Sequence, residues 1–419
     1  MEEIRLVPAL GEFRALSSDY LPFDESDLNL VIDYDMKEPK LEKISRLIGP
    51  SRLPQKDESN RRVIYAQPSE SRGAIIDSKY FDRRVKIPER EATGLKIKGC
   101  RYLDLPPFPV TFVTPKSEVE GLEVSPEIFT AYKKDGTPFE GYKDQPFGMT
   151  VKHAEREVKM SLAANFLEIP TNMYGIGTGE YSGMIFNGFL KNKQEPMGTA
   201  QFLLTRNDDR VSQLVLNHRD SNFSSEDALE ITSRLKKLAY ELNTDVWTLI
   251  YDHLFEKSGR LLSRMHSSGF IHGPRQSHYM NYVTPNKQYP ELAVCDFESS
   301  MLVSELTDKQ SMCYMTEDLA NLASSAENFQ EAFTAAILKC VKEKLDIDDL
   351  AIGKAVDKVK EMWLPLGDVV RGYVGDIGDL KRVVTGPQTS LFDIVRKVRG
   401  EDLKKTRKEL NVLSNAMYR

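Results

Sequence analysis

The sequence is poor in cysteine and lacks the patterns in which cysteine usually acts. Its four cysteines (Cys100, Cys295, Cys313 and Cys340) are widely spaced and form no Cys-x-x-Cys pair. No cysteine and histidine cluster has the spacing of zinc ligands. The cysteines are therefore expected to be free thiols in a reducing compartment.

Long apolar runs are also missing. No stretch approaches the roughly 18 apolar residues that a membrane-spanning helix needs. The first residues, MEEIRLVPALGEF, are acidic and contain no apolar core of a signal peptide. We therefore expect a cytoplasmic protein with no membrane partner.

An excess of positive charge is absent as well. The 57 Lys and Arg residues are outnumbered by 63 Asp and Glu residues, and the net charge is −6. General nucleic-acid binding is therefore not expected. The basic segment VRKVRGEDLKKTRKEL interleaves Glu401, Asp402 and Glu409, which indicates a solvated helix face. With 40% hydrophobic and 29% charged residues, the chain has the composition of a soluble, folded protein.

The most informative feature that the sequence lacks is one carboxylate in a loop of the catalytic type. The stretch GFIHGPRQSHYMNYV, beginning at Gly269, has the form of the catalytic loop of an ATP-dependent phosphotransferase, but Pro274 stands where such loops carry aspartate. Proline cannot accept a proton, so a conventional protein-kinase mechanism through this position is excluded. No serine-hydrolase elbow or His-Glu-x-x-His motif offers another chemistry.

The first half of the chain is predicted to be rich in strands. Residues 1–60 are expected to form an extension, and residues 61–223 a small sheet with one main helix over 151–167. Residues 175–183, GIGTGEYSG, are expected to form a turn between strands. The segments expected to be strands are RVIYAQ, RGAIID, GLKIKGC, VTFVT, FLLTR and SQLVLNHR.

Residues 224–419 are predicted to be mostly helical. Ser224 and Asp227 fit a capping pair, and apolar residues recur every three to four positions up to Leu242. A second helix, capped by Thr244, is expected to end just before Gly269. GYVGDIG near residue 372 is expected to be a loop, and the basic segment a C-terminal helix. The fold expected is α+β and bilobed, protein-kinase-like, with a small β-rich N-lobe and a larger helical C-lobe.

Phosphoryl or nucleotidyl transfer requires a cation on the phosphates and a carboxylate that holds that cation. Lys96 and Lys98 lie on one face of an expected strand, and Glu157 on the following helix is the natural partner of Lys98. The alternative is that Lys98 and Glu157 are exposed residues that never meet.

The segments KGCR and REVKMSLAANFLEIPT resemble the selenoprotein O family, kinase-fold proteins that lack the usual catalytic aspartate and transfer AMP to protein hydroxyls. That family carries Lys-Gly-Ala-Gly-Arg, then a helix of the form Arg-Glu-Phe…Leu-Gly-Ile-Pro-Thr. The residues that match the helix without a gap are Arg156, Glu157, Leu167, Ile169, Pro170 and Thr171. The resemblance implies that Lys98 and Glu157 are the phosphate-binding lysine and its partner.

Further segments extend this resemblance. EPMGTAQFLLTR is similar to a family strand that ends in a basic residue, which implies that Arg206 faces the nucleotide. GFIHG matches the family's Gly-Phe-Ala-His-Gly and implies a nucleotide contact for His272, although this imidazole is alternatively a brace for the loop. AVCDFESS occupies the place of the metal-binding segment, which implies that Asp296 is a metal ligand.

Several departures from the family keep alternatives open. The glycine-rich segment before the lysine is reduced to SESRGAII. Asn281 takes the place of the metal-binding asparagine only if two residues are inserted; otherwise that place belongs to Tyr279. Asp296 follows the apolar run LAVC, a strand that would deliver a carboxylate to Mg²⁺, but it could instead cap a turn.

The function predicted is ATP- and Mg²⁺- or Mn²⁺-dependent transfer of AMP to protein hydroxyls. Two alternative functions stay open. One is an inactive pseudokinase that serves as an interaction module. The other is transfer of the γ-phosphoryl group to a small-molecule acceptor, since DFESS…TEDLANL is similar to the Asp-x-Glu…Asp-Leu-Ala pattern of small-molecule phosphotransferases.

Overall fold

The protein is represented by a computed structural model of a mixed α+β chain that divides into two compact units. The sheet unit comprises Met1–Asp208, Asp296–Met301 and Glu409–Arg419, and the helical unit comprises Asp209–Cys295 and Leu302–Lys408. The residues that the structure describes are 3–5, 66–69, 73–78, 84–87, 90–98, 130–132, 138–140, 149–184, 196–216, 223–273, 278–345, 365–375, 390–400 and 402–417.

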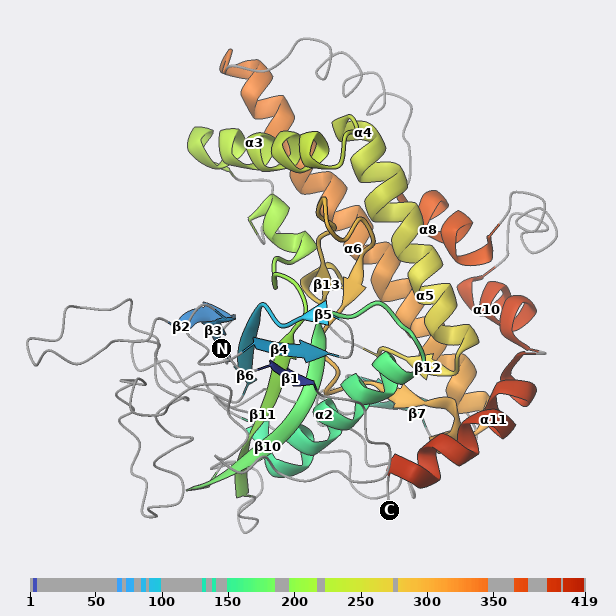
Figure 1. The fold of residues 1–419 in the computed structure, drawn as a ribbon. Coiled ribbons are helices and arrows are strands. Elements are labelled where there is room, and N and C mark those ends of the chain that lie inside the picture. Colours follow the sequence, from blue (N-terminus) through green and yellow to red (C-terminus); the bar gives the residue numbers. More distant parts are fainter. Residues whose placement is uncertain are drawn as a thin grey trace, which may run out of the picture. The chain divides into compact units, whose positions relative to one another are not determined.

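The sheet unit is built around an antiparallel sheet of six strands (Figure 1). Five of them follow the spatial order β2-β3-β6-β11-β10, and the short strand β9 pairs with β11. Their bounds are β2 Ala66–Ser69, β3 Gly73–Asp77, β6 Gly94–Lys98, β9 Met149–Thr150, β10 Met173–Met184 and β11 Pro196–Leu204. The expected strands RVIYAQ, RGAIID, GLKIKGC and FLLTR overlap β2, β3, β6 and β11, whereas VTFVT lies outside the described residues.

Helix α2 (Val151–Phe166) packs against β10 and β11. Its small and apolar residues Ala154, Val158 and Ala164 are fully buried, so the helix has an apolar face that packs against the sheet. The helix ends where Glu168 takes a left-handed conformation, at φ 55°, shortly before Pro170. The predicted helix over 151–167 is therefore confirmed.

The glycine-rich stretch Gly175–Gly183 is part of β10, so the prediction of a turn there is wrong. Glycine serves here to bring the strand close to α2. A Cβ on Gly175 would lie 2.6 Å from Ser161 Oγ and 2.7 Å from a methyl carbon of Val158. The amide of Gly175 instead donates a hydrogen bond of 2.9 Å to Ser161 Oγ.

Two further small sheets belong to the sheet unit. Strand β1 (Glu3–Arg5), the only described part of the expected extension, pairs in parallel with β4 (Arg84–Ile87), and β4 pairs with β5 (Arg90–Glu91). Strands β7 (Thr130–Tyr132) and β8 (Pro138–Glu140) pair in antiparallel orientation.

The helical unit contains most of the described helices. The helices are η5 Val211–Val215, α3 Ser225–Glu241, α4 Val246–Thr248, η6 Leu249–Glu256, α5 Lys257–Ser267, η7 His278–Met280, η8 Val303–Glu305, α6 Asp308–Lys342, α8 Pro365–Val374 and α10 Leu391–Arg399, and α11 Asp402–Met417 begins in this unit. The chain between these helices forms the two-residue strands β12 Phe270–Ile271, β13 Tyr282–Val283 and β14 Ala293–Val294, and it re-enters the unit through β15 Met301–Leu302.

Helix α3 agrees with its prediction. Ser224 and Asp227 form the expected capping box, and Ile231, Leu235 and Leu238 are buried. Leu242, also expected to face inward, is the C-cap residue and is only half-buried. The segment expected to be the strand SQLVLNHR begins instead with the 3₁₀ helix η5.

The expected second helix is a composite of α4, the π-helix η6 and α5. Its N-cap is Asp245 rather than Thr244, because the Asp245 carboxylate accepts hydrogen bonds from the amides of Trp247 (2.9 Å) and Thr248 (3.1 Å). The wider π-helical turn was not predicted, since the repeat of apolar residues does not distinguish it from an α-helix.

Two other expectations in the helical unit are corrected. Gly372 and the two residues after it belong to α8 and not to a loop; glycine is required because a Cβ on Gly372 would lie 1.9 Å from the carbonyl oxygen of Glu256. The basic segment forms two helices, α10 and α11. Its Arg399 is buried, donates a 2.7 Å hydrogen bond to the carbonyl of Ser263 and lies over the ring of Tyr373.

Candidate functional site

Lys98 is the centre of a buried charge cluster in the sheet unit. Its ammonium group donates a hydrogen bond of 2.9 Å to Glu157 Oε1 and a second, short one to Asp296 Oδ1. Only 3% of Lys98 and 0% of Glu157 are exposed. The ion pair predicted between Lys98 and Glu157 is therefore confirmed, and Asp296 joins it.

Local structure explains how these three residues meet. Lys98 is the last residue of β6, and Glu157 projects from the middle of α2. Asp296 comes two residues after β14 and has a φ of 69°, in the left-handed region that aspartate tolerates better than most residues. The left-handed conformation turns the chain sharply at this carboxylate.

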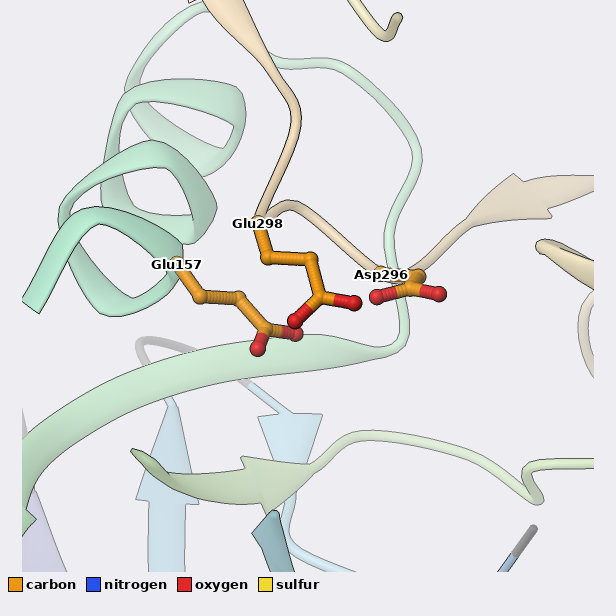
Figure 2. A group of neighbouring side chains, drawn as sticks. All are labelled: Glu157, Asp296 and Glu298. Carbon is orange, nitrogen blue, oxygen red and sulfur yellow. The ribbon is translucent and has the colours of Figure 1, made fainter. Parts of the chain in front are cut away.

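Glu298 is a further member of the cluster, and no role was predicted for it. One carboxylate oxygen from each of Glu157, Asp296 and Glu298 lies within 4.8 Å of the others. Figure 2 shows the three side chains reaching toward one another from α2 and from the segment that follows β14. The Asp-Phe-Glu sequence places this further carboxylate only two residues after Asp296.

The electrostatics of the cluster are dominated by burial. Burial is the main cause that raises the pKa of Glu157 to about 8 from its ordinary value of 4.5. Lys98 lowers this pKa, and the negative charges of Glu298 and Asp296 raise it. A second positive charge beside Glu157 would favour its ionised form.

The donor set fits a hard divalent cation. Glu157 Oε2 is buried and has no hydrogen-bond partner. Carboxylate oxygens are the ligands that Mg²⁺ and Mn²⁺ prefer, and a buried carboxylate oxygen without a donor is otherwise costly. The three carboxylates are therefore suited to hold such an ion.

A second buried ion pair lies in the sheet unit. Lys96, two residues before Lys98 on the same strand, donates a 2.7 Å hydrogen bond to Asp208, and the Asn172 amide donates one of 2.8 Å to the other oxygen of Asp208. Arg206, predicted to face the nucleotide, is also buried and lies two residues beyond β11. Its contact with a nucleotide stays a prediction.

His272 lies in the helical unit, within a buried polar network. Its Nε2 is 2.9 Å from the carbonyl oxygen of Cys295, and its contact with a nucleotide stays a prediction. Asn281, proposed from the sequence as a metal ligand, is 5% exposed, and its backbone is bonded to His278 and Cys295. Pro274 lies outside the described residues, and Tyr279 is a buried aromatic stacked on Phe255.

Asp318, on α6, organises this network and was not identified from the sequence. Its two oxygens accept hydrogen bonds from the amides of His272 (2.9 Å) and Gly273 (2.7 Å), and His266 Nε2 lies 3.2 Å away. Burial lowers the pKa of the neighbouring His278 to about 3, so that imidazole is neutral near pH 7. The Asp-Leu-Ala pattern contained this residue but gave no sign of its partners.

No protein-family model and no curated protein matches the chain. Among solved structures, one described as "WaaP in complex with acyl carrier protein" is similar at a TM-score of 0.26 and 12% identity, over 71% of this chain and 88% of that chain. A TM-score this low does not define a common fold. Among the described residues, no helix is long and apolar enough to span a membrane.

Proposed function

We propose that the chain is a protein-kinase-like transferase that binds Mg-ATP in the sheet unit and transfers AMP to protein hydroxyls. The observation that carries the proposal is the position of Lys98, held between the carboxylates of Glu157 and Asp296. A buried lysine with two carboxylate partners is pre-organised to meet phosphate oxygens when a cation takes over one of those partners.

The order of elements supports the same proposal. Lys98 ends the third strand of the sheet in chain order, α2 carries its glutamate partner, and β10 and β11 then complete the sheet. Protein kinases likewise place their phosphate-binding lysine on the third strand and pair it with a glutamate of the helix that follows.

Each residue of the cluster has a role in this proposal. Lys98 binds the phosphate oxygens, Glu157 orients Lys98, and Asp296 is the metal ligand. A divalent cation at these carboxylates would neutralise phosphate charge that one lysine cannot offset. A nucleotide contact of Arg206, which also lies in the sheet unit, completes this set. The nucleotide contact of His272 and the metal ligation by Asn281, both in the helical unit, stay predictions from the sequence.

The reaction proposed does not need a base at position 274. The oxygen of the acceptor hydroxyl bonds to the α-phosphorus, the bond from that phosphorus to the bridging oxygen breaks, pyrophosphate leaves, and the hydroxyl proton passes to solvent. Positioning and charge neutralisation provide most of the acceleration in such transfers, so the replacement of aspartate by proline does not exclude activity.

The deciding experiment uses ATP labelled separately at the α- and γ-phosphates, with Mg²⁺ or Mn²⁺. Transfer of the α-label to protein, and not of the γ-label, is the expected result. The matched control is Glu155→Gln, two residues from Glu157 on the same helix and outside the cluster, which should transfer label at the wild-type rate.

A second candidate function is transfer of the γ-phosphoryl group to a small molecule. It is favoured by the pairing of Asp296 with Glu298 in one cluster, which fits the Asp-x-Glu pattern of small-molecule phosphotransferases. Transfer of the γ-label to a small acceptor would select it. If neither label moves and ATP causes no thermal shift, the chain is an interaction module instead.

A further inference from the structure

The carboxylate cluster has the dimensions of a metal site formed by the protein alone. Oxygen ligands of Mg²⁺ lie about 2.1 Å from the ion, so two of them on one ion are about 3 to 4 Å apart. The oxygens of Glu157, Asp296 and Glu298 lie within 4.8 Å of one another. Side-chain movements of up to about 1 Å would bring all three onto one ion.

The charge of the cluster also favours the binding of a cation. When all three are ionised, the carboxylates of Glu157, Asp296 and Glu298 and the ammonium group of Lys98 together carry a formal charge of −2. Glu157 and Glu298 are 0% and 3% exposed, so water screens their repulsion poorly. One divalent cation would bring the sum of these four side chains to zero.

The hydrogen bonds leave one ligand position on Glu157. Lys98 binds Oε1, whereas Oε2 is buried without a hydrogen-bond partner. A buried carboxylate oxygen that receives no donor is costly, and a metal ion is one partner that would remove this cost. The Glu157 carboxylate points toward the other two in Figure 2.

We propose that Glu298, together with Asp296 and Glu157 Oε2, binds one Mg²⁺ or Mn²⁺ ion in the absence of nucleotide, with Lys98 beside the ion. Glu298 is thus a metal ligand in addition to Asp296. The inference rests on the proposed function for the use of the ion, but its binding is measurable without ATP.

The test is titration of the full-length, chelator-treated chain with Mn²⁺ alone, in which the free ion is measured by electron paramagnetic resonance. The wild type should bind one Mn²⁺ per chain, and Mg²⁺ should displace it. Glu298→Gln keeps the size of the side chain and removes its charge, and it should weaken Mn²⁺ binding at least tenfold. Glu155→Gln should bind as the wild type does.

A variant of Lys98 separates metal binding from nucleotide chemistry. Lys98→Met removes the positive charge next to the ion, so Mn²⁺ should bind several-fold more tightly while label transfer from ATP is lost. A role of Glu298 in folding alone would leave the Mn²⁺ affinity of a folded Glu298→Gln chain unchanged. If Glu298→Gln does not fold, Asp296→Asn provides the same comparison.

The outcomes distinguish this inference from the proposed function. A wild type that binds no Mn²⁺ without ATP, or a folded Glu298→Gln variant with wild-type Mn²⁺ affinity, overturns the inference even if the α-label is transferred. Loss of Mn²⁺ binding in Glu298→Gln upholds the inference even if the wild type transfers no label, and in that case the proposed function fails.

Discussion

Glu157 in the sheet unit and Asp318 in the helical unit are both carboxylates buried in the protein, but their surroundings differ. Both oxygens of Asp318 accept backbone hydrogen bonds, from His272 and Gly273. Glu157 uses one oxygen for Lys98, and the other has no donor. Asp318 is therefore satisfied within its own unit, whereas Glu157 has capacity left for a ligand.

This difference separates a structural carboxylate from a candidate functional one. Burial raises the pKa of both residues, but the histidines and backbone amides around Asp318 lower its pKa again. Lys98 lowers the pKa of Glu157, but the negative charges of Glu298 and Asp296 raise it. A protein retains such an arrangement when the charge has a use, since isolated buried carboxylates are otherwise costly.

The largest loss of stability is expected for Asp318→Ala. The substitution leaves the amides of His272 and Gly273 and the ring of His266 without their acceptor, and should lower the free energy of unfolding by about 3 to 5 kcal/mol. Glu327→Ala, at an exposed position of the same helix, is the control and should change it by less than about 0.5 kcal/mol. Denaturant unfolding of both variants measures the difference; equal stabilities would show that the polar network does not hold the helical unit together.

Asp296→Asn, in contrast, should reduce activity strongly and change stability little. Asparagine tolerates the left-handed backbone at this position, so stability should change little, while metal-dependent label transfer falls by about 100-fold or more. Rates of transfer and thermal unfolding with and without Mg-ATP measure both effects. If Asp296 only caps a turn, stability should instead fall by around 1 kcal/mol with an unchanged response to ATP.

Glu157→Gln tests the effect of the raised pKa in the metal-free chain. Glu157 has a pKa of about 8 in the folded chain and an ordinary value of 4.5, so between these values the folded state binds more protons than the unfolded state. Its contribution to stability is present below pH 4.5 and is lost as pH rises toward 8.

Glutamine removes this dependence, and the variant should be more stable than the wild type by about 1 to 2 kcal/mol at pH 8 in chelator. Denaturant unfolding at several pH values gives the comparison. A constant difference between the two proteins from pH 5 to 8 would contradict the raised pKa.

The smallest change in stability is expected for Ser161→Ala. The Ser161 hydroxyl takes part in a hydrogen bond within the sheet unit. The substitution removes the acceptor of the buried Gly175 amide and should cost about 1 kcal/mol, without an effect on Mn²⁺ binding. The exposed Ser324→Ala is a control of the same chemistry and should be neutral. A change in Mn²⁺ affinity in Ser161→Ala would show that the cluster depends on how β10 packs against α2.

Much of the local structure could be predicted from the sequence. The three- to four-residue spacing and the capping pair located α3, and Pro170 marked the end of α2. The same signals failed where backbone geometry depends on a neighbour. Gly175 and Gly372 look like turn residues in a sequence, but both are glycines because another segment passes too close for a Cβ.

The candidate site was predicted in part. Lys98, Glu157 and Asp296 were identified through a family resemblance, and the structure brings them together. Glu298 and Asp318 were missed in their roles because no spacing in a sequence states which buried carboxylates receive hydrogen bonds.

The sequence by itself determined the residue types and the local elements: a lysine at the end of a strand, a glutamate on an amphipathic helix, and an Asp-Phe-Glu segment. It also showed that position 274 carries no catalytic aspartate. Only the tertiary structure decided that Glu157, Asp296 and Glu298 share one buried cluster. The reason is physical: secondary structure follows from contacts within a few residues, whereas the charge balance of this site depends on segments far apart in the sequence, with Lys98 lying 59 positions from Glu157 and 198 positions from Asp296.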